Sequence, residues 1–336
     1  MTEHAKSHLP PQGDDASEVS LFERASGAFA LDPFRAAPMP SELAVPVTRR
    51  VQRTAAHAGS IPVAATPPEP GPQFEASASV VPEPAAPEAP SAVSLTGPRH
   101  PIDRERLRER GLIVPEDGAT ALLEEFRIIK RQVLASAHAA GDTAAQRVLI
   151  CSPLQGDGKT FCATNLAIAM AGERGGEVVL IDADFAKPSI LATLGLPSAP
   201  GLMDALADPS LRVEDLVLAT DIDGLFVLPA GDMTATDSEW LASARTAEVL
   251  DRLTRGAPGR MLVFDSPPAL AASPAADLAQ HVGQAVLVAR ADKTGRSALE
   301  DAVHLLGACP DIKLLLNATH FSPSGRRFGT YYGHEG

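Results

Sequence analysis

A stretch near the middle of the chain has the residue types and spacing of a phosphate-binding loop. The segment Cys151-Ser-Pro-Leu-Gln-Gly-Asp-Gly-Lys-Thr160 follows the apolar run Val148–Cys151 and opens an apolar segment at helical spacing, Phe161–Met170. A strand, a glycine-rich turn and a helix in this order are the setting in which Gly-Lys-Thr binds phosphate. The glycines let backbone N–H groups converge on an anion at the positive end of the helix.

Each residue of this loop has an expected task. Lys159 reaches the β- and γ-phosphates, and the Thr160 hydroxyl ligates Mg²⁺. We expect the Lys159 side chain to be exposed at the loop. The usual first glycine, five residues before Gly158, is Pro153 here, so a chance loop is the alternative interpretation. The expected nucleotide-binding residues of the loop are Gly156, Asp157, Gly158, Lys159, Thr160 and Phe161.

Three carboxylates end apolar runs elsewhere in the chain. Asp182 and Asp184 close the run Glu177–Asp184, and Asp265 closes Arg260–Asp265. Carboxylates at the ends of parallel strands collect at one edge of the sheet, where ligands bind. Mg²⁺ prefers oxygen ligands of this kind. Any one of these residues alone could be a helix N-cap or a turn former, but all three beside a phosphate loop favour a Mg-nucleotide site.

Apolar runs alternate with helical patterns along the second half of the chain. This alternation predicts an α/β fold with a mainly parallel sheet covered by helices on both faces. The expected strands are Val178–Ile181, Leu225–Leu228, Met261–Phe264, Ala285–Ala289 and Ile312–Leu316. The expected helices lie near 160–173, 236–255, 274–281 and 294–307, with a further amphipathic helix from about residue 119.

Composition divides the chain into four parts. Residues 31–101 hold half of the 30 prolines, so we expect a disordered linker there. Residues 1–30 contain a candidate docking helix, for which a transient helix without a partner is the alternative. The folded domain is expected over 102–318. A flexible tail, 319–336, carries both tyrosines of the chain, Tyr331 and Tyr332.

Charge and hydropathy exclude several classes of protein. The net charge of −13 argues against a general nucleic-acid binder. The sequence contains no run of about 18 apolar residues that would cross a membrane. It also begins without the apolar core of a signal peptide. The three cysteines lack metal-ligand spacing and suggest a reduced, cytosolic protein.

Together these motifs resemble the bacterial tyrosine kinases (BY-kinases) of the MinD/ParA-like class of P-loop proteins. The loop Gly156–Thr160, the run Ile181-Asp-Ala-Asp184 and the run Phe264-Asp-Ser-Pro-Pro268 correspond to the family's Walker A, A′ and B motifs. The phrases Gly111–Asp117 and Leu228-Pro-Ala-Gly231 are similar to the exosortase-associated (PEP-CTERM locus) tyrosine autokinase branch. The resemblance covers about two-thirds of the chain.

The resemblance implies an ATP- and Mg²⁺-dependent protein-tyrosine autokinase. Lys159, Asp182, Asp184 and Asp265 are the implied catalytic residues, with Thr160, Asp184 and Asp265 at the metal. Asp182 would orient or deprotonate the tyrosine hydroxyl. Asn317 is at the position where relatives contact adenine, although an Asn after a strand is equally consistent with a turn residue. Tyr331 and Tyr332 would accept phosphate in trans.

The resemblance also implies partners. The helix Glu124-Glu-Phe-Arg127-Ile-Ile-Lys130 is similar to a motif with which family members contact neighbouring subunits, so Glu124, Arg127 and Lys130 are expected outside the apolar stripe at a homo-oligomer contact. A membrane polysaccharide co-polymerase would be the activator and would hold the cytoplasmic chain at the inner membrane. The implied process is the biosynthesis and export of exopolysaccharide.

Departures from the family pattern keep two other functions open. These are an ATPase switch of the MinD/ParA kind without protein phosphorylation, and a scaffold ordered by nucleotide. Leu154 occupies the position of the signature lysine of MinD/ParA ATPases, which argues against the switch. Lys130 and Ala186 replace arginines of the kinase motifs, and two tyrosines replace the usual cluster.

Overall fold

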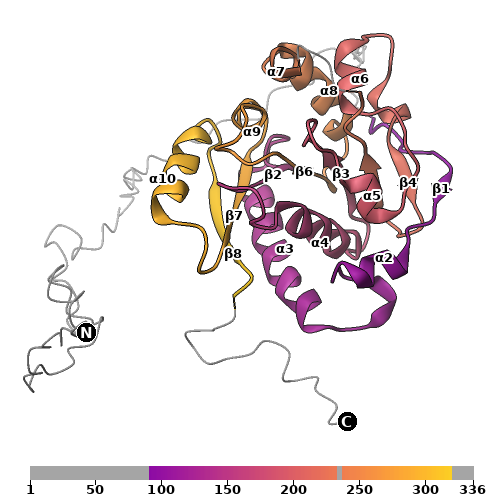
Figure 1. Cartoon of the computed structure of the whole chain (residues 1–336). Helices are drawn as coiled ribbons and strands as arrows, with labels where there is room; N and C mark the ends of the chain where they lie inside the picture. The colour runs from indigo at the N-terminus through magenta and orange to yellow at the C-terminus, as the bar shows by residue number, and fades with distance from the viewer. Residues whose placement is uncertain (1–90, 233–236, 320–336) are drawn as a thin grey trace, which may run out of the picture. The chain divides into compact units, whose positions relative to one another are not determined.

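The apolar runs of the sequence form an eight-stranded sheet in the part of the chain that the computed structural model describes, residues 91–232 and 237–319 (Figure 1). The strand order is β1-β4-β5-β3-β6-β2-β7-β8. All neighbours are parallel except β4 and β5, which are antiparallel. The strands are β1 (Arg99–His100), β2 (Arg147–Cys151), β3 (Glu177–Asp182), β4 (Leu218–Thr220), β5 (Leu225–Leu228), β6 (Arg260–Asp265), β7 (Gln284–Arg290) and β8 (Ile312–Asn317).

Helices cover both faces of this sheet, as the alternation of patterns predicts, so the expected fold class is confirmed. Figure 1 shows α3 and α4 crossing one face. The α-helices are α2 (Arg104–Glu109), α3 (Ala121–Ala140), α4 (Lys159–Ala171), α5 (Ile190–Leu194), α6 (Leu202–Ala207), α7 (Asp237–Leu241), α8 (Ala244–Thr254), α9 (Pro274–Ala279) and α10 (Arg296–Leu305). Short 3₁₀ turns lie at Pro115–Asp117 and Val213–Asp215.

The central strands supply apolar side chains to two cores at once. In β2, Val148 and Ile150 pack with α3 and α4, whereas Leu149 and Cys151 pack in the cluster on the other face, with α8 and α9. Successive side chains of a strand point to opposite faces, so a strand covered on both sides must be apolar throughout. This requirement explains why the strands of the sheet centre are the easiest elements to predict.

The folded unit begins earlier than the sequence pattern indicates. The sequence pattern places residues 91–101 in the linker, but β1 pairs with β4 and Leu95 is buried in the core. The Arg260 guanidinium donates a hydrogen bond to the Val93 carbonyl at 2.9 Å. These contacts are made with residues more than a hundred positions away, so the proline content of this region gives no sign of them.

The helix expected over 236–255 is two helices, α7 and α8. The chain turns at Ser243, whose hydroxyl donates to the Trp240 carbonyl at 2.6 Å. The predicted segment 1–30, the linker up to residue 90, and the tail from 320 with Tyr331 and Tyr332 lie outside the described residues. Among the described helices, none combines the length and the apolar composition that crossing a membrane requires.

Candidate nucleotide-binding and phosphoryl-transfer site

The loop between β2 and α4 turns through two glycines with left-handed backbone. Gly156 has φ +85° and Gly158 has φ +102°. A side chain is strained in this region of φ. At Gly158 there is also no space, because a Cβ atom would lie 2.1 Å from Asn317 Nδ2. The loop therefore has the shape that the Gly-x-Gly-Lys-Thr motif predicts.

Helix α4 begins directly at this loop with free backbone donors. Its N-cap is Gly158, and no side chain caps it in the described structure. The first N–H groups of a helix have no partner within the helix and attract anions. The Phe161 ring packs edge-to-face on Phe126 of α3, with centroids 6.2 Å apart. Phe161 can therefore meet a nucleotide through its backbone, while its ring fixes α4 against α3.

Lys159 is the first residue of α4, and its side chain is buried. Only 8% of the side chain is exposed, and Nζ lies 4.0 Å from Asp184 Oδ2. The expectation of an exposed Lys159 is therefore wrong. The ammonium group lies among the carboxylates at the strand ends, and this pairing keeps the charged group favourable in a buried position.

Asp265, at the end of β6, is the most deeply buried of the carboxylates. Its Oδ2 accepts a hydrogen bond from Thr160 Oγ1 at 2.6 Å, whereas its Oδ1 is buried without a partner in the described structure. Burial raises the pKa of Asp265 to about 7; Asp182 and Asp184 act in the same direction, and Thr160 and Lys159 oppose it. A buried oxygen without a partner is costly unless a ligand satisfies it.

Asp182 lies beside Asp265, since the two residues are register partners of β3 and β6. Its Oδ2 accepts from the backbone N–H of Ser189 at 2.7 Å and of Ile190 at 2.9 Å, at the start of α5. Its Oδ1 accepts from Asp184 N at 3.3 Å. Burial raises the pKa of Asp182, and the three backbone bonds oppose that rise. Asp182 thus holds the turn after β3 in addition to any role in chemistry.

The set Thr160, Asp184 and Asp265 suits Mg²⁺ bound together with a nucleotide. Within the described ranges, no three His, Cys, Asp or Glu residues form a ready-made metal cage. Mg²⁺ at nucleotide sites takes one or two protein carboxylates and completes its shell with water and phosphate oxygens. The unpartnered Asp265 Oδ1 is the kind of atom such an ion, or its water, would satisfy.

Further residues reach the loop from the end of β7, and the sequence pattern does not single them out. Thr294 Oγ1 donates to Asp157 Oδ1 at 3.0 Å. Arg290 Nη1 donates to the Gly156 carbonyl at 3.3 Å. Lys293 Nζ lies 3.7 Å from the position of a Cβ on Gly156. Their position just after a predicted parallel strand was the available signal, because that is the edge where ligands bind.

The three residues expected at a subunit contact do not share one surface. Arg127 and Glu124 pair with each other on α3, and both are partly exposed. Lys130 is buried instead, and its Nζ pairs with Glu173 Oε2 at 2.6 Å. Its expected place outside the apolar stripe is wrong. Lys130 lies one turn from Phe126, so its stem packs with the stripe while its ammonium reaches Glu173.

The loop, the uncapped helix and the strand-end carboxylates define a P-loop nucleotide-binding protein of the α/β class. No family model matches the chain. The chain is 30% identical over 201 residues to tyrosine-protein kinase YwqD of Bacillus subtilis (strain 168), a match that covers 60% of this chain and 82% of that protein. The chain belongs to the family of bacterial tyrosine-protein kinases.

A longer relative agrees with this assignment, and a solved structure has a similar fold. The chain is 32% identical over 163 residues to tyrosine-protein kinase Wzc of Salmonella typhi, which covers 48% of this chain and 22% of that protein. The match is thus less than a quarter of the length of this relative. The fold is similar to that of the chimerical protein CapA2B2, with a TM-score of 0.51, 24% identity and coverage of 63% of this chain and 98% of that chain.

Proposed function

We propose that the chain is an ATP-dependent tyrosine autokinase that transfers the γ-phosphoryl group of Mg-ATP to Tyr331 and Tyr332 of a neighbouring copy. The observation that supports this most directly is the contact between Thr160 and Asp265 at the start of α4. It joins the phosphate loop to a buried carboxylate with one free oxygen. Lys159 and Asp184 lie beside it.

Phosphoryl transfer depends mainly on positioning and on neutralising charge. In the proposed mechanism, Lys159 and the backbone N–H groups of the loop hold the β- and γ-phosphates. Thr160, Asp184 and Asp265 would hold Mg²⁺, which would offset the charge of the phosphate oxygens. The burial of Lys159 strengthens its interaction with the phosphates, because solvent screens a buried charge less.

Asp182 is proposed to orient the acceptor hydroxyl or to take its proton. A tyrosine has a pKa of about 10, so a base assists the attack at neutral pH. The raised pKa of Asp182 makes it a stronger base than an exposed aspartate. The Asp182 Oδ2 atom already accepts from the N–H groups of Ser189 and Ile190, so the proton would go to Oδ1, which receives one long bond, from Asp184 N at 3.3 Å.

The family resemblance supplies the proposed partners. We include in the proposal a homo-oligomer in which Glu124 and Arg127 contact a neighbouring subunit, and a membrane polysaccharide co-polymerase as activator. The site would then regulate the synthesis and export of exopolysaccharide from the cytoplasmic side of the inner membrane. Lys130 is left out of the proposed contact, because it is already paired with Glu173 within the chain.

The test of the kinase is phosphate transfer to the tail. The full chain is incubated with Mg²⁺ and γ-labelled ATP, with and without the cytoplasmic fragment of its membrane partner. The chain has two tyrosines, so all phosphotyrosine must map to Tyr331 and Tyr332. Tyr331→Phe with Tyr332→Phe should remove the label and leave ATP binding intact.

Release of inorganic phosphate without labelled tyrosine would instead support an ATPase switch. Leu154 argues against that outcome, since an apolar side chain, 38% exposed at the loop, stands where such ATPases carry their signature lysine. ATP binding without either reaction would support a scaffold ordered by nucleotide.

The subunit contact has its own test. Arg127→Glu should reduce the size of the assembly in light scattering and slow phosphorylation between copies. Arg296→Glu is a matched control, because Arg296 also pairs with a glutamate of its own helix, Glu300, and is exposed. If the two variants have the same assembly size and phosphorylation rate, Arg127 makes no subunit contact. Its pairing with Glu124 is then only a local ion pair worth about 0.2–0.5 kcal/mol.

A further inference from the structure

Asn317, the last residue of β8, uses both ends of its side-chain amide within the protein. Its Nδ2 donates to the Asp157 carbonyl of the phosphate loop at 2.9 Å. Its Oδ1 accepts from the backbone N–H of Ala318 at 2.8 Å. The amide therefore connects the loop to the point where the chain leaves the sheet.

The same side chain limits what can stand at the next loop position. A Cβ on Gly158 would lie 2.1 Å from Asn317 Nδ2 and 3.4 Å from its Cγ. Asn317 thus packs against one loop glycine and hydrogen-bonds the residue before it. Both contacts depend on the conformation of the loop and on nothing in the nucleotide base.

A second tie holds the loop from the same side. The Asp157 side chain is fully buried, and it accepts from Leu154 N at 3.1 Å and from Thr294 Oγ1 at 3.0 Å. In the sheet, β2 lies between β6 and β7, and β8 lies beyond β7. The carboxylates of β3 and β6 are therefore on one side of the loop, and Thr294 and Asn317 are on the other.

The backbone at this junction is unusual. Ala318 has φ +54°, and it is one of two non-glycine residues with positive φ in the described chain; the other is Asp292. L-residues rarely adopt this conformation unless their surroundings hold them in it. Here the Asn317 side chain accepts a hydrogen bond from the Ala318 N–H. The residue that fixes the loop therefore also holds the strained turn after β8.

We propose that Asn317 is a positioning residue, which sets the shape of the phosphate loop through Asp157 and Gly158, rather than a residue that recognises adenine. The proposal rests on the nucleotide binding proposed above. It assigns Thr294 the same role through the Asp157 carboxylate. Positioning acts on the phosphates, which all nucleoside triphosphates share, whereas base recognition acts on the purine alone.

This difference can be measured with three ligands. Dissociation constants of Mg-ATP, Mg-GTP and Mg-tripolyphosphate are determined for the wild type and for Asn317→Ala. A lost hydrogen bond predicts a loss of about 3- to 10-fold, and positioning predicts the same factor for all three ligands. A loss for ATP with unchanged binding of tripolyphosphate would overturn the proposal.

Two further variants keep the test informative if Asn317→Ala is unstable. Thr294→Val removes the hydroxyl that binds the Asp157 carboxylate and leaves the Asn317 side chain in place, so it should weaken the three ligands equally. Gly158→Ala should nearly abolish binding, and adding Asn317→Ala should restore part of it, because the 2.1 Å approach disappears while the φ of +102° remains. Strictly multiplicative losses in the double variant would contradict the packing argument.

The wild type separates this inference from the proposed function. If the unmodified chain binds none of the three ligands, both fail. If it binds them and Asn317→Ala loses only the preference for ATP, the inference alone fails and Asn317 becomes the adenine contact.

Discussion

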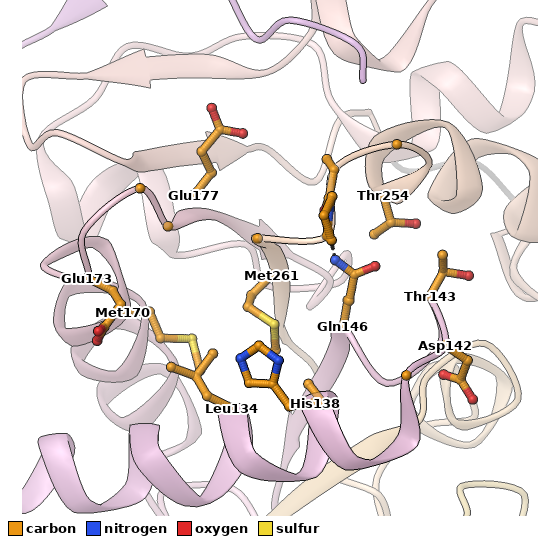
Figure 2. A pocket seen from close by; sticks show the side chains of 18 of the residues that line it. Leu134, His138, Asp142, Thr143, Gln146, Met170, Glu173, Glu177, Thr254 and Met261 are labelled. Carbon is orange, nitrogen blue, oxygen red and sulfur yellow. Dashed lines mark hydrogen bonds between the residues drawn. The ribbon is translucent and has the colours of Figure 1, made fainter. Parts of the chain in front are cut away.

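The two edges of the sheet are built in opposite ways. At the carboxyl-terminal edge, the phosphate loop lies beside buried charged groups, with Asp265 at the centre. At the amino-terminal edge, a cavity of about 500 Å³ opens between the ends of α3 and α4. Leu134 and His138 of α3, Met170 of α4 and Met261 of β6 line it (Figure 2).

The two edges hold different kinds of buried polar side chain. At the cavity, the Gln146 side chain donates to the carbonyls of Ala257 and Arg260 at 2.8 and 2.9 Å, and Figure 2 shows Gln146 among the residues that line the cavity. At the loop, Asp265 Oδ1 has no partner among the described residues. Other buried atoms also have no partner in the described structure, Arg147 Nε at the start of β2 among them, but Asp265 Oδ1 is the carboxylate oxygen that lies beside the phosphate loop.

The largest expected effect is a loss of phosphoryl transfer when a charge is removed at the carboxyl-terminal edge. Lys159→Ala should lower phosphoryl transfer by at least ~10²-fold, because it removes a preorganised charge from the phosphates. The matched control is Lys313→Ala near the amino end of β8, where Lys313 pairs with Asp311 and donates to Gln284 Oε1 at 3.1 Å. Transfer rates and circular dichroism of both variants are compared. Equal rates would contradict the assignment of the loop.

The second effect concerns the amino-terminal edge. Met261→Ala should destabilise the fold by about 2–4 kcal/mol, because it enlarges the cavity and removes buried apolar surface. Met261 is 4% exposed and lies on the same strand as Asp265. Urea unfolding measures the loss, and the affinity for Mg-ATP should stay at the wild-type value. A parallel loss of affinity would show that β6 transmits changes from one edge to the other.

The third effect is a pH dependence at the carboxyl-terminal edge. The pKa of Asp265 is about 7 in the folded protein and about 3.9 in an unfolded chain. Because the folded state holds the extra proton, the contribution to stability is complete below pH ~4 and is lost as the pH rises through 7. Without Mg²⁺ or nucleotide, the free energy of unfolding should fall by up to ~1.4 kcal/mol per pH unit within this window.

Asp265→Asn should reduce that slope, because the amide does not titrate, while the raised pKa of Asp182 leaves a slope of the same sign. Asp208→Asn is the control, since Asp208 is exposed and its pKa is lowered by its hydrogen bonds to Ser210. Denaturant unfolding between pH 4 and 8 measures both variants. An unchanged slope in Asp265→Asn would assign the proton to another group.

The smallest expected effect is at the turn after β8. Ala318→Gly should stabilise the fold by about 0.5–1 kcal/mol, because glycine adopts a φ of +54° without strain. Thermal unfolding is the measurement. Ala302→Gly is the opposite control, since Ala302 is buried in α10 and glycine there should destabilise. Destabilisation by both changes would show that Ala318 is unstrained.

The sheet centre was predictable from sequence because its strands are covered on both faces. Val178–Ile181 and Met261–Phe264 are apolar throughout for that reason and lie within β3 and β6. β1 was missed because it is two residues long, Arg99 and His100, and pairs with β4 across the fold. The break at Ser243 was missed because apolar residues continue at helical spacing on both sides of it.

The residues of the site that belong to one local sequence motif were predictable. Gly158 and Thr160 belong to the short motif Gly-x-Gly-Lys-Thr, which is recognised from neighbouring residues alone. Thr294 and Asn317 reach Asp157 across 137 and 160 positions, and no local pattern encodes such a contact. Lys130 was misplaced for the same reason, since its partner Glu173 lies just after the end of α4, 43 positions away.

The unpartnered oxygen of Asp265 also has a calorimetric consequence. With a pKa of about 7, this carboxyl group is partly protonated in the free protein at neutral pH. A divalent cation bound there needs the carboxylate form, so binding expels the proton into the buffer. The heat of nucleotide binding should then change with the ionisation enthalpy of the buffer, and that dependence counts the protons released at each binding event.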